Sequence, residues 1–532
     1  MLVSRNRATE NGGGLAIERS TGAQASSVSR STLEANTASG GGGLVLGIAT
    51  DLAMVNSNVR DNTAVLGNGG GALVQRGGRL QLASSTVSGN RATRQQGGGI
   101  ALEGGAELSG TTSILEQNAV AAGQGGGLYA SGAVVTLTGM IVRGNTSASG
   151  SGGGLALFEG TIWRMTDGTI LENSAPAGSG GGAFIGGIDA RLDSVELRGN
   201  TALASGGGLT VLGNTTVVLD RVTFTLNRVL ASNSSTDGLG GALYAVGNAT
   251  ISIVNSVFTF NSAGYGGGAI EWFNSGTLSI ADSRLQNNSA AVTGGAIESR
   301  GSGPVVILRS TVSDNATISG PGGGLAFFGP FTVERSTISN NRTSNGTGGG
   351  IYVQGPGPNA IRNSTISGNI AGVGGGIAAG GTSALVQLTH VTLVGNRAFQ
   401  QGGGVGIFTP QGGVLFANTL LAGNSGPMGS SNCSGPSSPS LGGNLSDDAT
   451  CIGLVLPTDR SNVPPGVSPM LSANGGSTST HALLQGSAAI NAGIAPFCLS
   501  TDQRGWTRVG PCDIGAFEFG ASPLAPRPAT RK

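Results

Sequence analysis

The chain has 532 residues, of which 100 are glycine and 10% are charged, and its formal net charge is +1. This balance argues against a nucleic-acid partner, because such partners are bound through clustered basic residues. The glycine content argues against a helical solenoid, since glycine is costly inside helices. No apolar run of about 18 residues occurs that would form a membrane-spanning helix.

A repeat of about 27 residues organises the chain as far as Asn424. In one copy, the segment 85–89 leads to Asn90, and three glycines at 97–99 precede the triplet 100–102. A fixed period of this size marks a repeat architecture. The asparagines that close successive copies are Asn36, Asn62, Asn90, Asn118, Asn145, Asn173, Asn200, Asn227, Asn261, Asn288, Asn315, Asn341, Asn369, Asn396 and Asn424.

Within each copy the apolar residues alternate with small ones, as Leu44 and Leu46 or Leu80 and Leu82 do. Alternation with a period of two indicates short strands with one buried face. Three short strands and three turns in about 27 residues predict one coil of a single-stranded parallel β-helix, an all-β fold with about 16 coils. Parallel connections are right-handed with few exceptions, so we expect a right-handed helix. The recurring asparagines are expected to form a hydrogen-bonded ladder along the coils.

The start of the chain and one longer repeat depart from this regularity. Residues 3–6 already resemble the end of a coil, and no signal peptide precedes them, which suggests a truncated start. The step from Asn227 to Asn261 is the longest of the series. We attribute the difference to an insertion at Val229–Asp237, which is expected to protrude as a loop.

The middle of the chain carries paired motifs. Phe224–Asn227 and Phe258–Asn261 each end in the ladder asparagine, and Gly240–Leu243 and Gly267–Ile270 follow them. These motifs resemble the polymorphic outer-membrane-protein repeat of bacterial surface proteins. The match is partial, because other copies have valine, isoleucine or leucine in place of phenylalanine. The repeat as a whole is similar to pectate-lyase-like β-helices.

Beyond Asn424 the period stops and the segment 425–446 becomes rich in serine, proline and glycine. All the cysteines lie in this part of the chain. An even number confined to one module suggests disulfides and an oxidising compartment, with zinc as the weaker alternative. Local pairing is one of three possible connectivities and would join Cys433 to Cys451 and Cys498 to Cys512.

The C-terminal part carries the most specific resemblance. It has the sequence segments 474–476, 480–483, 489–493, 501–505 and 512–518. These resemble the choice-of-anchor Q domain, which closes bacterial β-helix proteins before an anchoring element. We therefore expect three parts: β-helix repeats at 1–424, a disulfide-bonded module of this kind at 425–520, and a flexible tail at 521–532. The tail has no apolar span or sortase-type motif, so surface attachment is implied by the resemblance alone.

Two acidic positions suggest a binding face. Glu271 and Glu298 lie one period apart, each after a Gly-Ala-Ile triplet, and should stack about 5 Å apart on neighbouring coils. Trp272 follows Glu271 and could stack on a sugar, although strand alternation would turn its ring inward. Paired carboxylates beside an aromatic ring are typical of glycosidase clefts. The competing interpretation is a solvated surface, because catalysis requires convergent groups with perturbed pKa values.

Three aspartates extend this set of candidates. Asp193 and Asp220 lie one period apart, and Asp282 occupies a similar place, with Asn255 between them. Stacked acids can hold calcium, which makes calcium the one candidate cofactor. His390 is expected to be structural. His481 lies near several charged residues of the C-terminal module, and an arginine–carboxylate network that fastens the module is the favoured interpretation over catalysis: Asp502, Arg504, Arg508, Asp513 and Glu518.

Two functions fit these observations. The first is a secreted or cell-surface β-helical stalk or adhesin that binds carbohydrate or another surface protein and has no catalytic activity. The second is an extracellular polysaccharide lyase or glycoside hydrolase on the same scaffold, and the fold alone does not choose between them. The uniformity of the repeat favours the first, because an enzyme site usually interrupts a repeat with long loops.

Overall fold

The computed structural model describes residues 1–18, 26–230, 236–381, 384–409, 413–436 and 438–523. It contains short β-strands and one 3₁₀ helix, η1 (Ala495–Phe497), and none of the described residues forms an α-helix. The chain divides into unit 1 (Met1–Thr277) and unit 2 (Leu278–Lys532). The two units are described separately below. The boundary expected at Asn424 lies within unit 2 and stays a prediction.

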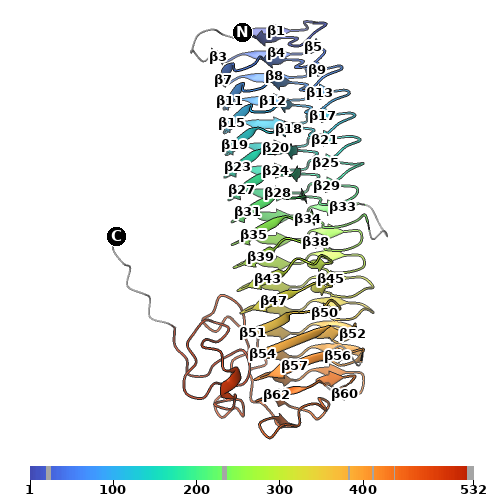
Figure 1. The fold of residues 1–532 in the computed structure, drawn as a ribbon, viewed down its shortest axis with the longest axis vertical. Coiled ribbons are helices and arrows are strands. Elements are labelled where there is room, and N and C mark those ends of the chain that lie inside the picture. The colour runs from blue at the N-terminus through green and yellow to red at the C-terminus, as the bar shows by residue number, and fades with distance from the viewer. Residues whose placement is uncertain (19–25, 231–235, 382–383, 410–412, 437, 524–532) are drawn as a thin grey trace, which may run out of the picture. The chain divides into compact units, whose positions relative to one another are not determined.

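One coil of unit 1 illustrates the repeat (Figure 1). It consists of β14 (Ile100–Leu102), β15 (Glu107–Thr111), β16 (Ile114–Glu116) and β17 (Ala119–Val120). Each strand pairs in parallel with its counterpart in the next coil, which confirms the parallel β-helix. The expectation of three strands per coil was wrong, because the small residues after the asparagine form the additional short strand β17. Their alternation is too short to be recognised in sequence.

The coils make three sheets in each unit. Strands β15 and β16 belong to the same sheet. Thr112 and Ser113 separate them, and the φ of Thr112, 46°, is left-handed. We call the sheet that contains β15 and β16 the first sheet, and in unit 1 it extends from β1 (Leu2–Ser4) to β36 (Val257–Thr259). The sheet that contains β14, directly after the glycine turn, is the glycine-adjacent sheet, and in unit 1 it extends from β2 (Leu15–Ile17) to β38 (Ile270–Asn274). The 16 strands of the glycine-adjacent sheet, counted over both units, agree with the expected number of coils. Of the insertion expected at Val229–Asp237, residues 231–235 lie outside the described residues.

In unit 2 the first sheet changes character. It begins with the pair β39 (Leu278–Ala281) and β40 (Arg284–Gln286) and continues with the pairs β43 (Val305–Leu308) and β44 (Thr311–Ser313), and β47 (Phe331–Glu334) and β48 (Thr337–Ser339). The next two coils each have one continuous strand in place of the pair, β51 (Asn359–Ser367) and β54 (Leu385–Val394). The pair returns as β57 (Gly413–Ala417) and β58 (Leu420–Ala422).

The asparagines form the expected ladder. The backbone N–H and the side-chain Nδ2 of Asn118 both donate to Oδ1 of Asn145, each at 3.0 Å. Nδ2 of Asn118 also donates to the carbonyl of Val87, in the preceding coil. Each ladder asparagine in this series is buried, so its amide is satisfied by these bonds and not by water. The ladder therefore links every coil to the coils before and after it within a unit.

The ladder of unit 2 ends on carboxylates. Nδ2 of Asn424 donates to Oδ1 of Asn432 at 2.8 Å. The backbone N–H of Asn432 then donates to Asp448 and its Nδ2 to Asp447, each at 2.8 Å. Because carboxylate oxygens accept hydrogen bonds, they suit the end of a ladder in which the bonds between amides all run onward. The coil pattern therefore stops at a chemically defined point.

Glycine is required at the turn before each triplet. Gly97 has a φ of 71°, which is left-handed. A Cβ atom on Gly98 would lie 2.4 Å from the backbone of Ala119 and from the carbonyl oxygen of Gly126 in the next coil. The turn can approach its neighbours this closely only without a side chain.

Leucine, isoleucine and valine fill the inside of the coils, together with a few large aromatic rings. Trp163 and Trp272 are completely buried. The rings of Phe224 and Phe258, from the paired motifs, stack inside unit 1 with centroids 4.6 Å apart. Their motif therefore has a packing role.

The C-terminal module contains β62 (Ser440–Gly442), β63 (Leu445–Ser446), β64 (Arg460–Ser461) and η1. Disulfides join Cys433 to Cys451 and Cys498 to Cys512, with Cα–Cα distances of 4.8 and 5.9 Å. The local connectivity is thus confirmed. Figure 1 shows the later part of the module, in red, beside β51, β54 and β57.

We predict that the β-helix is modular in whole coils. Deleting residues 97–124 should remove one coil of unit 1 and leave a folded protein, because each coil contacts mainly its neighbours. Deleting residues 97–110 should lower the thermal unfolding midpoint strongly, because the strands on either side lose their register. Equal midpoints for the two deletions, measured by circular dichroism, would contradict the coil assignment.

We also predict that one ladder amide is worth several hydrogen bonds. Asn173→Ala should lower the free energy of unfolding by about 3 kcal/mol, because it leaves the buried backbone N–H of Asn145 without its acceptor and removes the side-chain bonds to Val142 and Asn200. Asn58→Ala, at an exposed position of β8 (Asn58–Arg60), is the control and should change it by less than about 0.5 kcal/mol. Similar values for both variants in urea titrations would reject this role.

Candidate functional site

The aspartates of unit 1 are engaged by an arginine. Asp193, at the end of β27 (Asp189–Asp193), is in register with Asp220, at the end of β31 (Thr216–Asp220). The guanidinium of Arg221 forms ion pairs with both carboxylates, and that with Asp220 measures 3.0 Å. A hydrogen bond from Ser194 and the charge of Arg221 lower the pKa of Asp193. Asn255 donates to Asp220 at 3.2 Å.

Asp282 of unit 2 has the same kind of partner. Nε and Nη2 of Arg309 donate to its two carboxylate oxygens at 2.7 and 2.6 Å. This bidentate pair lies on the left-handed residues of successive coils, since Asp282 and Arg309 have φ values of 50° and 46°. A calcium ion at any of these aspartates would therefore compete with a guanidinium. Calcium binding stays a prediction.

The two glutamates predicted as a face lie away from solvent. Glu271 and Trp272 belong to β38 of unit 1, and Glu298 belongs to β42 (Ile297–Ser299) of unit 2. All three side chains are 0% exposed. Oε1 of Glu298 accepts a hydrogen bond of 2.6 Å from Nε of Arg300.

The prediction that Trp272 offers a surface for sugar stacking was wrong, because its ring is buried. Strand alternation turns its ring into the core, and the neighbouring Phe273 is the exposed aromatic residue. Stacking on a sugar requires an exposed ring face. The structure thus leaves the candidate face without the aromatic residue that the sequence assigned to it.

The C-terminal module docks on one column of unit 2, formed by the left-handed residues Arg335, Asn363, His390 and Asn418. Arg335 donates to the carbonyl of Gln503, and Asn363 donates to that of Thr501. The ring of His390 contacts the carbonyl of Gly515 at 3.2 Å, and Asn418 donates to that of Ile494.

Threonines two residues further along the same coils complete this docking surface. Thr337 donates to the carbonyl of Ser479 at 2.6 Å, and Thr365 donates to Oε1 of Gln503 at 2.7 Å. Thr392 accepts from the backbone N–H of Ala516 at 2.9 Å. Gln503 is itself completely buried, and its side-chain amide forms hydrogen bonds that hold the module against the coils.

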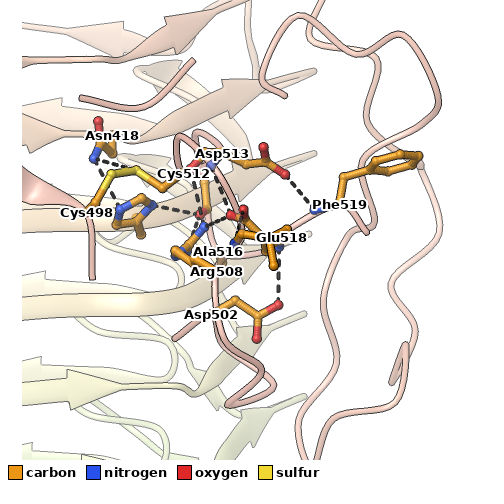
Figure 2. A network of polar contacts seen from close by, with 12 residues as sticks. Asn418, Cys498, Asp502, Arg508, Cys512, Asp513, Ala516, Glu518 and Phe519 are labelled. Atoms are coloured by element: carbon orange, nitrogen blue, oxygen red, sulfur yellow. Dashed lines mark hydrogen bonds and ion pairs between the residues drawn. A yellow bond between two sulfur atoms is a disulfide. The ribbon is translucent and has the colours of Figure 1, made fainter. Parts of the chain in front are cut away.

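The expected arginine–carboxylate network forms inside the module (Figure 2). Arg508 pairs with Glu518 at 2.7 Å. Arg504 pairs with Asp502 at 2.7 Å. The guanidinium of Arg504 also contacts two aromatic rings, with its Cζ 3.9 Å from the centroid of Trp506 and 3.8 Å from that of Phe517. Nη2 of Arg508 reaches Asn363 in the coils at 3.0 Å. The network therefore fastens the module to itself and to the β-helix.

His481 lies outside this network. Its Nε2 contacts Oγ of Ser367 and its Nδ1 the carbonyl of Ser468, each at 2.8 Å. Burial lowers the pKa of His481, and burial together with the charge of Arg508 lowers the pKa of His390 well below its usual value. Both imidazoles are therefore neutral docking contacts.

A metal site is not available beside His390. Ligand atoms of His390, Cys498 and Cys512 lie within 4.8 Å of one another, the one such grouping in the described part of the chain. The two sulfur atoms are bonded to each other, so neither is a thiolate that could bind a metal.

Docking of the module creates a cleft that the sequence did not indicate. It has a volume of about 400 Å³ and lies between the first sheet of unit 2 and the segment 496–501. Glu334, Arg362, Gln387 and Thr389 form its floor. These residues stand at ordinary outward-facing strand positions, so their role appears only once the C-terminal segment is placed over them.

We predict that acid loosens the module. Because His390 and His481 have lowered pKa values when docked, the undocked chain binds more protons below pH 6.5. Docking should therefore weaken as the pH falls from 7.5 to 5, by up to about 1.4 kcal/mol per pH unit for each histidine. Hydrogen exchange of residues 463–519 measures the effect.

The control separates the histidines from the carboxylates. Burial raises the pKa of Asp513, which acts in the opposite direction, since acid then favours the folded state. The variant His481→Gln should show a smaller loss of protection between pH 7.5 and 5 than the unaltered chain. An unchanged pH dependence in this variant would contradict the assignment to His481.

Comparison with known proteins identifies the family. A family model described as a right handed beta helix region matches residues 1–112 and 241–434, which is more than half of the chain. A search of curated proteins finds no match. Within the described residues, no helix is long and apolar enough to cross a membrane. Parallel coils and this match together show that the chain belongs to the right-handed beta helix family.

Proposed function

We propose that the chain is a secreted or cell-surface β-helical scaffold of the stalk or adhesin type, which binds its partner without catalysing a reaction. The observation that carries this proposal is that the candidate aspartates and glutamates are either ion-paired or buried. Asp193, Asp220 and Asp282 are ion-paired to arginines, and Glu271 and Glu298 are buried. A glycosidase needs two carboxyl groups that converge on the substrate.

Three features support a location outside the cell. The disulfides Cys433–Cys451 and Cys498–Cys512 are typical of oxidising compartments. The repeat motifs resemble those of polymorphic outer-membrane proteins, and residues 425–520 resemble the choice-of-anchor Q domain. The partners that fit such a scaffold are carbohydrate or another surface protein, with calcium as a candidate ligand of the aspartates.

The alternative is an extracellular polysaccharide lyase or glycoside hydrolase. One observation favours it: the cleft of unit 2 has a carboxylate, Glu334, and a guanidinium, Arg362, on its floor. A lyase needs a base and a group that stabilises a developing negative charge. The chain would then combine a uniform solenoid with a single site at the C-terminal module.

We predict binding without turnover. The full chain and the variant Glu271→Gln/Glu298→Gln are applied to a glycan array and incubated with a panel of neutral and acidic polysaccharides. Both proteins should bind the same glycans equally and release no oligosaccharides. Calcium is added to the full chain and to Asp282→Asn, and the thermal midpoint of each is measured.

Release of products by the full chain would reject the non-enzymatic function. If the glutamate variant then lost this activity, the buried glutamates would be the catalytic pair. If Arg362→Gln lost it instead, the cleft of unit 2 would be the active site. An increase in the midpoint with calcium, absent from Asp282→Asn, would establish a calcium site.

A further inference from the structure

The floor of the cleft in unit 2 carries opposite charges side by side. Glu334 ends β47, and it is in register with Arg362 of β51, which is in register with Thr389 of β54. The preceding residues Val333 and Ile361 point into the core, so all three side chains point outward. Neighbouring parallel strands are about 4.8 Å apart, which places the carboxylate and the guanidinium in adjacent positions of one row.

These two charges are available to a ligand. Among the ion pairs within 4.0 Å in the described chain, none involves Glu334 or Arg362. The charge of Glu334 acts on Arg309, whose bidentate partner is Asp282, and on Arg335. Arg362 is exposed. Thr389 points outward yet is only 4% exposed, because the segment 496–501 covers it. The cleft is thus partly shielded from water, which strengthens electrostatic attraction inside it.

The wall of the cleft includes apolar side chains and is held in place. Pro496, Phe497 and Leu499 line it on the side of the C-terminal module. The carbonyl of Thr501 accepts a hydrogen bond of 2.8 Å from Asn363, and a disulfide ties Cys498 to Cys512. A wall fixed at both ends loses little conformational freedom when a ligand binds, which favours affinity.

We propose that this cleft binds a zwitterionic α-amino acid group. The guanidinium of Arg362 pairs with the ligand carboxylate, a geometry that arginine favours. Glu334 pairs with the ammonium group, and the ligand side chain lies against Phe497. The volume of about 400 Å³ is in the range of small-molecule sites and suits a single amino acid or a dipeptide.

An acidic saccharide fits the floor less well. Its carboxylate would pair with Arg362, but it has no positive group for Glu334, so the two negative charges would lie near each other. A zwitterion can form ion pairs with Arg362 and Glu334 at the same time. This inference goes beyond the proposed function and does not depend on where the chain is located.

The test uses ligands that differ by one charge. L-Phenylalanine, 3-phenylpropionate, phenethylamine and galacturonate are titrated into the full chain, and binding is followed by saturation-transfer NMR and calorimetry. Phenylalanine should bind at least about tenfold more tightly than either single-charge analogue, because each analogue lacks one of the two ion pairs, and one ion pair in a shielded site raises the affinity about tenfold. Galacturonate should bind more weakly than phenylalanine.

Variants assign the charges. Arg362→Gln should weaken phenylalanine and 3-phenylpropionate binding alike, whereas Glu334→Gln should remove only the preference for phenylalanine over 3-phenylpropionate. Arg284→Gln, at an exposed arginine of β40 outside the cleft, should bind as the unaltered chain does. Absence of phenylalanine binding overturns the proposal. Preferential galacturonate binding that is lost in Arg362→Gln also overturns it and assigns the cleft to acidic saccharides.

Discussion

The structure depends on one constraint: each buried asparagine amide has to find its partners in the neighbouring coils. Within each unit, a single Oδ1 atom accepts two hydrogen bonds from the preceding coil, and Nδ2 donates to the next. A buried amide without these partners would cost as much as several favourable contacts contribute. Turn lengths can vary only where the asparagine returns to its place, which explains the narrow range of repeat lengths.

The ladder also has a direction, and the direction explains where it ends. The bonds between ladder amides all run from a donor to Oδ1 of the next higher-numbered asparagine, so the last asparagine of the series needs an acceptor from outside the repeat. Asp447 and Asp448 supply such acceptors at Asn432. Asn444, which accepts from Thr419, likewise donates to Asp459 at 3.1 Å through its backbone and 3.0 Å through its side chain. The carboxylates of the C-terminal module thus complete the hydrogen bonding of the last coils.

The same outer position serves different purposes along unit 2. At Asp282 and Arg309 the left-handed residues form an exposed ion pair, and from Arg335 to Asn418 they hold the C-terminal module. The change requires no new backbone geometry, since these positions all have positive φ values. Substitution of polar side chains alone turns a solvated column into a docking surface. The cleft over Glu334 and Arg362 arises as a consequence of this docking.

Local patterns in the sequence determined the fold. Alternation of apolar and small residues, the glycine turns and the spaced asparagines each have a physical cause that acts within one coil or between neighbours, so the parallel β-helix, the ladder and the arginine–carboxylate network could be predicted. The short strand β17 could not, because two residues carry no period. Only the tertiary structure decided that Arg221 and Arg309 neutralise the aspartates and that the segment 496–501 covers Thr389. These outcomes depend on contacts between neighbouring coils and over more than a hundred residues, and the register and docking that create such contacts are not encoded in any single repeat.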